Sequence, residues 1–100
     1  THDAVLTELL TFFAEEGRYA REQAASTVRR ILGYGEMIVV PADRALFLAA
    51  LDRYAARPDK GYSLVDCMSM AVMERHGITH VLTNDHHFRQ EGFVVVSDAP

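Results

Sequence analysis

The sequence has little cysteine, proline or glycine and no long hydrophobic run, and each scarcity excludes a class of protein. A single cysteine, Cys67, cannot form an internal disulfide, which favours a reducing compartment and predicts a cytoplasmic protein. Six glycines and three prolines, with 24% charged residues, exclude collagen-like and disordered chains. The longest nearly apolar stretch, residues 64–73, falls far short of the roughly 20 residues of a membrane span, so we expect no membrane contact.

An excess of positive charge is also missing. Ten Lys and Arg residues stand against fourteen Asp and Glu residues, and the net charge is −4. A simple basic clamp for nucleic acid is therefore not expected. A polyanionic partner would need divalent cations, held on clustered carboxylates, to invert the local charge.

The sequence does have enough apolar residues, 49% of 100, for one compact domain over residues 1–100. Apolar spacing predicts helices at 3–15, from 19 or 20 to 32, at 42–56 and at 63–76, a turn or short helix at 84–90, and strands at 37–40, 80–83 and 93–96. Strands separated by helices predict an α/β fold with three layers, α/β/α, around a parallel sheet.

Three carboxylates stand where the apolar pattern does not expect a charge. Glu8 lies at the edge of an apolar arc, which predicts a half-buried side chain that is either a functional acid or the partner of an arginine. Asp66 interrupts the apolar stretch and is either a functional acid or, with Ser63, a helix cap. Asp85 directly follows a strand, where parallel sheets bind ligands, or else caps the next short helix.

The residue types in this set favour one kind of metal. Carboxylate oxygens from several elements, with no Cys or His cluster at zinc spacing, favour Mg²⁺ or Mn²⁺. His86 and His87 are adjacent, so on a regular helix or strand their side chains would point in different directions and would not chelate one ion. Cys67 has no basic neighbour and is expected to be a core residue rather than a nucleophile.

Three blocks of the sequence resemble the PIN domain family, and their order and spacing agree with it: THDAVLTELL at 1–10, RPDKGYSLVDC at 57–67 and VLTNDHHF at 81–88. This resemblance implies a metal-dependent endoribonuclease, a hydrolase of RNA phosphodiester bonds, built on a parallel α/β sheet. Many PIN domains are VapC-like toxins of toxin–antitoxin pairs, so the resemblance also implies an antitoxin protein as a possible partner.

The resemblance assigns roles to particular residues. It makes Glu8, Asp66 and Asp85 the catalytic residues and the ligands of Mg²⁺ or Mn²⁺, with Ser63 and Thr83 as supporting hydroxyls. The family has a further aspartate at the end of a first, central strand, and no residue of this sequence corresponds to it. We therefore expect a PIN-like domain that lacks its N-terminal part, whose exposed strand edge promotes a homodimer.

Two other functions fit the same residues. Without the first acid, the chain is a catalytically incomplete PIN-like module that acts in protein–protein interaction or dimerisation. A structural α/β domain, in which the three acids are only caps, is the third reading. Inhibition of RNA cleavage by EDTA would favour the enzyme, and metal-independent binding of a partner would favour the module.

Added Mn²⁺ is expected to raise the melting temperature of the wild-type chain but not that of Asp66→Asn, because a ligand that binds only the folded state stabilises it. Thermal melts with and without the ion measure this difference. A clean melt with no rise in the wild type would mean that the acids do not form a metal site in this chain.

Overall fold

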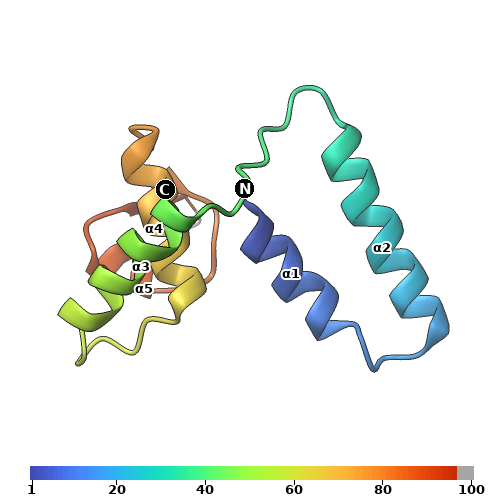
Figure 1. Cartoon of the computed structure of the whole chain (residues 1–100), viewed down its shortest axis with the longest axis horizontal. Helices are drawn as coiled ribbons and strands as arrows, with labels where there is room; N and C mark the ends of the chain where they lie inside the picture. The colour runs from blue at the N-terminus through green and yellow to red at the C-terminus, as the bar shows by residue number, and fades with distance from the viewer. Residues whose placement is uncertain (97–100) are drawn as a thin grey trace. The chain divides into compact units, whose positions relative to one another are not determined.

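A computed structural model describes residues 1–96 (Figure 1), and the chain divides into two compact units, Thr1–Ala42 and Asp43–Pro100. Each unit has its own helices and its own buried residues, and each is described by itself. Among residues 1–96, no helix combines the length and the apolar character that crossing a bilayer requires.

The first unit is a pair of helices, α1 (Asp3–Phe12) and α2 (Arg18–Gly33), which lie side by side and are joined by a short turn (Figure 1). The buried residues of these helices are Leu6, Ala24 and Val28. Both helices were predicted from their apolar spacing, although α1 ends at Phe12 and continues as a turn rather than a helix to residue 15.

The predicted buried strand at 37–40 is wrong. Only Val40 pairs, in an isolated parallel bridge with His2, where the Asp3 N–H donates to the Val40 carbonyl (3.1 Å). Met37 and Ile38 are exposed, Ile38 at 75%. A β-branched run forms a strand only beside a segment that accepts and donates its backbone hydrogen bonds. In this unit residues 1–3 bond to Val40 and, through the Thr1 amino group, to the Ile38 carbonyl (3.2 Å), which makes a single bridge rather than a strand.

The second unit is built around α4 (Leu64–Arg75), which packs against α3 (Arg44–Ala56). The largest fully buried side chains come from these two helices: Leu46, Met70 and Cys67. This confirms the prediction that the apolar helix is central, because a helix that is apolar on nearly every side must be covered. Burial raises the pKa of the Cys67 thiol, as expected for a packed residue rather than a nucleophile.

The strands of the second unit are short and parallel. β1 (His80–Val81) pairs with β2 (Val94–Val95), with His80 opposite Val94, and α5 (His87–Gln90) lies between them in the sequence. Gly77, with φ +66°, makes the left-handed turn that ends α4 ahead of β1. The α/β class is confirmed, while both strands are shorter than the predicted 80–83 and 93–96.

Leu46→Ala is expected to lower the free energy of unfolding by about 2–5 kcal/mol, because it removes a fully buried side chain from the contact between α3 and α4. Urea unfolding measures this loss. The matched control is Leu48→Ala on the same helix, where the side chain is 49% exposed and the expected change is below about 1 kcal/mol. Equal losses in the two variants would contradict the described packing.

Candidate functional site

Asp66 is held at the start of α4 by two reciprocal hydrogen bonds with Ser63. The Asp66 N–H donates to Ser63 Oγ (3.0 Å), and the Ser63 N–H donates to Asp66 Oδ2 (3.0 Å). This is the capping box that the sequence predicts, and it fixes the orientation of a carboxylate that is about one-fifth exposed. A carboxylate accepts several contacts at once, so the cap leaves Asp66 able to bind a further group.

Asp85 lies in the turn between β1 and α5. Its N–H donates to Thr83 Oγ1 (3.0 Å), and its Oδ1 accepts from the His87 N–H (2.9 Å). The N-cap of α5 is His86 rather than Asp85, so the interpretation of Asp85 as the helix cap is wrong, although its carboxylate accepts from the first residue of the helix. A third of the Asp85 side chain is exposed. The Thr83 hydroxyl shapes the turn through the backbone of Asp85 and so sets the direction of the carboxylate.

His87 brings these two acids together. Its Nδ1 lies 3.1 Å from Asp85 Oδ1 and 3.4 Å from Asp66 Oδ2. Within residues 1–96 this buried nitrogen has no hydrogen bond of acceptable geometry, because neither carboxylate contact is aligned for one. Two carboxylates from different elements therefore converge on one imidazole nitrogen. A polar atom buried in this way is stable only if a charge or a ligand compensates for its lost hydration.

The side chains of His86 and His87 lie closer together than the sequence analysis expects. One potential ligand atom from each of Asp85, His86 and His87 lies within 4.8 Å of the others. The expectation assumed regular secondary structure, but His86 precedes the first turn of α5, and there the two rings come to 4.5 Å between centroids. A mixed carboxylate and imidazole cluster was therefore not predicted.

Glu91 is a site residue that the sequence analysis missed. Its side chain is only 10% exposed, and its Oε2 accepts hydrogen bonds from Arg57 Nε (3.2 Å) and Tyr62 Oη (2.9 Å). Burial favours the neutral acid, but these hydrogen bonds outweigh it and lower the pKa of Glu91. No local pattern distinguishes Glu91 from a surface residue, because its partners come from the distant loop at 57–62.

Tyr62 connects the ion pair of Glu91 and Arg57 to the acid cluster, which we define as Asp66 and Asp85 around His87. Its ring is 4% exposed and meets the ring of His87 edge to face, with 5.2 Å between centroids. Burial and the hydrogen bond to Glu91 raise the pKa of Tyr62 to about 12. The phenol therefore stays protonated, and its O–H donates a hydrogen bond to Glu91. The position of His87 therefore depends on Tyr62 and, through it, on Glu91.

Glu8 lies on α1 in the first unit. The structure corrects the expectation that it is half-buried, because its side chain is exposed. The apolar arc of α1 covers less of the helix than the sequence suggests, and even Phe12 on that arc is 72% exposed. Of the three predicted acids, Asp66 and Asp85 are brought together within one unit, and Glu8 belongs to the other unit.

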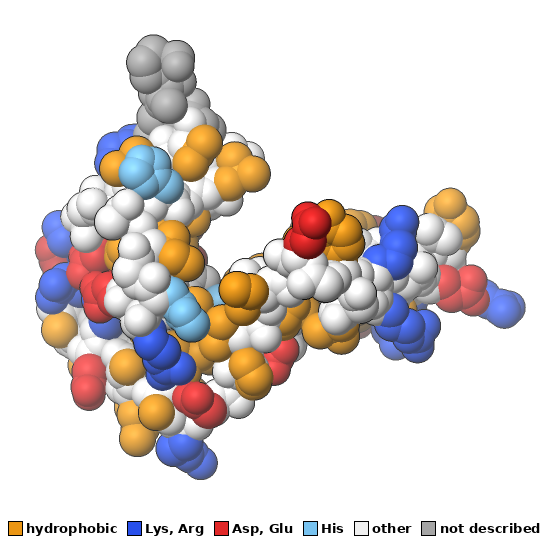
Figure 2. Space-filling view, turned by 90° about the horizontal axis from the view of Figure 1, so that it is seen from above, with side chains coloured by type: hydrophobic (Ala, Val, Ile, Leu, Met, Phe, Trp, Pro, Cys, Tyr) orange, Lys and Arg blue, Asp and Glu red, His pale blue; other side chains and the backbone are white. Residues whose placement is uncertain are grey.

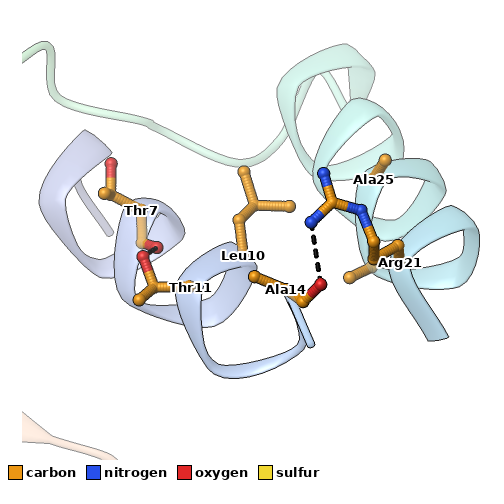
Figure 3. Close-up of a pocket in the computed structure, with 7 residues that line it drawn as sticks. Thr7, Leu10, Thr11, Ala14, Arg21 and Ala25 are labelled. Atoms are coloured by element: carbon orange, nitrogen blue, oxygen red, sulfur yellow. Dashed lines mark hydrogen bonds between the residues drawn. The ribbon is translucent and has the colours of Figure 1, made fainter. Parts of the chain in front are cut away.

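A groove of about 390 Å³ lies between α1 and α2 in the first unit, with Thr7, Leu10, Thr11 and Ala14 on one side (Figure 3). The Arg21 side chain crosses from α2 and donates to the Ala14 carbonyl (2.8 Å). The groove has no carboxylate in its lining, so it differs in chemistry from the acid cluster.

A model of the PIN domain family matches residues 1–94, which include both units and every predicted acid. The chain belongs to the PIN domain family. PIN domains are usually metal-dependent nucleases that act on RNA, and they generally use divalent ions, so the acid cluster of this PIN domain is the natural candidate for its active site. Searches of curated proteins and of solved structures found no significant match.

The stability of this PIN domain is expected to fall as the pH decreases below about 4.5, the ordinary pKa of the glutamate. The pKa of Glu91 is lower in the folded state, so its contribution is complete above the unfolded value and is lost as the pH falls through the folded value. Urea unfolding between about pH 6 and about pH 3 measures the slope.

Glu91→Gln should flatten this slope, because the variant removes the group that titrates. Glu22→Gln is the control, since its carboxylate is 59% exposed and pairs only with Arg18 on the surface of α2. A pH profile for Glu91→Gln that follows the wild type would contradict the role given to Glu91.

Proposed function

We propose that this PIN domain is an endoribonuclease that hydrolyses RNA phosphodiester bonds with Mg²⁺ or Mn²⁺ held by Glu8, Asp66 and Asp85. The observation that carries the proposal is the convergence of Asp66 and Asp85, from two different elements, on the buried Nδ1 of His87. Carboxylate oxygens suit a hard divalent ion. A buried polar atom without an aligned hydrogen bond marks a place where a bound ion would supply the missing partner.

The residues around the acids act by holding them in place. The Ser63 N–H and hydroxyl keep Asp66 in its cap, and the Thr83 hydroxyl fixes the turn that carries Asp85. A divalent ion bound at such carboxylates supplies Lewis acidity and lowers the pKa of a water molecule. Ser63 and Thr83 are thus positioning residues, whose removal would change the geometry of the acids rather than the chemistry.

The charge distribution supports the need for a cation. On the face shown in Figure 2, acidic and basic side chains are interspersed, and the net charge of the chain is −4. An RNA backbone is therefore attracted by local positive charge and not by the molecule as a whole. Positive charge held at Asp66 and Asp85 would attract the scissile phosphate to the acids.

Glu8 is included in the acid set because it matches the family's helix glutamate. Its exposure on α1 leaves the carboxylate available to an ion or to solvent. The proposal therefore treats residues 1–100 as one PIN-like domain.

We propose a larger sheet as the frame of this domain, with three layers, α/β/α, as the family implies. The parallel bridge between His2 and Val40 supports this, because it has the strand direction that such a sheet requires.

A cytoplasmic toxin of a toxin–antitoxin pair, active as a homodimer, is the biological role we propose. The motifs that resemble VapC-like toxins support the toxin, and the single cysteine fits a reducing cytoplasm. Large apolar side chains exposed on the first unit, Phe12, Tyr19 and Ile38 among them, support contact with an antitoxin or a second copy.

Asp66→Asn and Asp85→Asn are each expected to reduce metal-dependent RNA cleavage at least about a hundredfold while leaving the fold intact, because each removes a ligand charge without changing size. Cleavage of a labelled RNA with Mg²⁺ or Mn²⁺, and with EDTA as a blank, measures this. The matched control is Asp52→Asn, an exposed acid on α3 that should cleave like the wild type.

Activity retained in Asp66→Asn would overturn the proposal. If the wild-type chain does not cleave RNA but binds a protein partner without metal, the catalytically incomplete module is the better description. The specific observation in favour of that module is the absence of a counterpart to the family's first aspartate.

A further inference from the structure

We infer that the imidazole of His87 is a direct nitrogen ligand of the ion bound by Asp66 and Asp85, so that the site favours first-row transition-metal ions over Mg²⁺. This inference rests on the proposed function, because it concerns the same ion. It adds a residue outside the predicted acid set and a preference among cations that an all-carboxylate site would not have.

The distances around Nδ1 are those of donor atoms that share an ion. Metal–ligand bonds in proteins are about 2.0–2.2 Å long, so neighbouring ligands of one ion lie roughly 3.0–3.5 Å apart. The separations from Nδ1 to Asp85 Oδ1 and Asp66 Oδ2 are 3.1 Å and 3.4 Å. Each of these two carboxylate oxygens thus lies at the distance from Nδ1 that separates neighbouring ligands of one ion, and Nδ1 forms no aligned hydrogen bond with the described residues.

The ring of His87 is held in this orientation from two sides. The backbone N–H of His87 donates to Asp85 Oδ1 (2.9 Å) and so fixes the residue that carries the ring, and the ring itself meets Tyr62, whose hydroxyl donates to Glu91. A ligand that is positioned before the ion binds loses little conformational freedom on binding. This arrangement distinguishes a built ligand from an imidazole that happens to lie near two acids.

His86 is the competing nitrogen donor, and its exposure argues against it. The His86 side chain is exposed, whereas the side chain of His87 is 20% exposed and its Nδ1 is buried. It is His87 whose Nδ1 lies within 3.4 Å of a carboxylate oxygen of both acids. His86 is therefore a matched control, with the same chemistry one residue away.

The nitrogen donor determines which ions the site prefers. Mg²⁺ binds oxygen almost exclusively and gives up its water reluctantly, whereas imidazole suits transition-metal ions. Replacing one oxygen ligand by His87 therefore raises the affinity for Mn²⁺ and its heavier neighbours relative to Mg²⁺.

Pulsed electron paramagnetic resonance of the untagged chain loaded with Mn²⁺ tests the inference, because it detects nitrogen bound to the ion without any measurement of cleavage. Nitrogen modulation is expected in the wild type and in His86→Gln and should be absent in His87→Gln. Labelling histidine with ¹⁵N should alter the modulation of the wild type. Titration should show that His87→Gln weakens the affinity for Mn²⁺ at least about tenfold. Competition with Mg²⁺ should show a much smaller loss of affinity for Mg²⁺ in the same variant.

The outcomes separate this inference from the proposed function. If Mn²⁺ binds in a manner that depends on Asp66 but the wild type lacks nitrogen modulation, His87 is not a ligand and the proposed metal site stands. Modulation that persists in folded His87→Gln and disappears in His86→Gln also overturns the inference. If the wild-type chain does not bind Mn²⁺, both the inference and the proposed metal dependence fail. The spectrum of the wild type decides the point even if a variant does not fold.

Discussion

The packing of α4 against α3 is the constraint on which the candidate site depends. α4 is apolar on nearly every side, and burying Met70 and Cys67 fixes its position in the second unit. The same helix begins with the capping box of Ser63 and Asp66, so the burial of its middle sets the position of a carboxylate at its end. The hydrophobic packing in the middle of α4 therefore determines where the carboxylate of Asp66 lies at the start of the helix.

The second requirement is electrostatic. The imidazole of His87 lies between Asp66 and Asp85, because its Nδ1 is close to a carboxylate oxygen of each. Tyr62, Glu91 and Arg57 support the imidazole from behind. The site is thus two layers deep. The ion pair of Arg57 with the buried carboxylate of Glu91 orders the ring of Tyr62, and this ring orders the histidine between the acids. Such a second layer is what gives a metal site a defined geometry.

Sequence patterns predicted the features that depend on near neighbours in the chain. The cap of α4, the burial of Cys67 and the positions of Asp66 and Asp85 all follow from spacing within about ten residues, and the structure agrees. The errors involve contacts between distant segments. The segment 37–40 has strand-forming residues, but among the described residues it forms no more than an isolated bridge at Val40. Glu8 is exposed because the packing of other residues around α1 is incomplete.

The sequence by itself determined the helices, the α/β class and the membership of the PIN domain family, because apolar periodicity, caps and family motifs are local properties of a chain. Only the tertiary structure decided that His87 stands between Asp66 and Asp85 and that Glu91 supports it through Tyr62. Those contacts join residues from α4, from α5 and from the loop before α4. Their distances depend on how the helices pack, and no pattern of neighbouring residues specifies them.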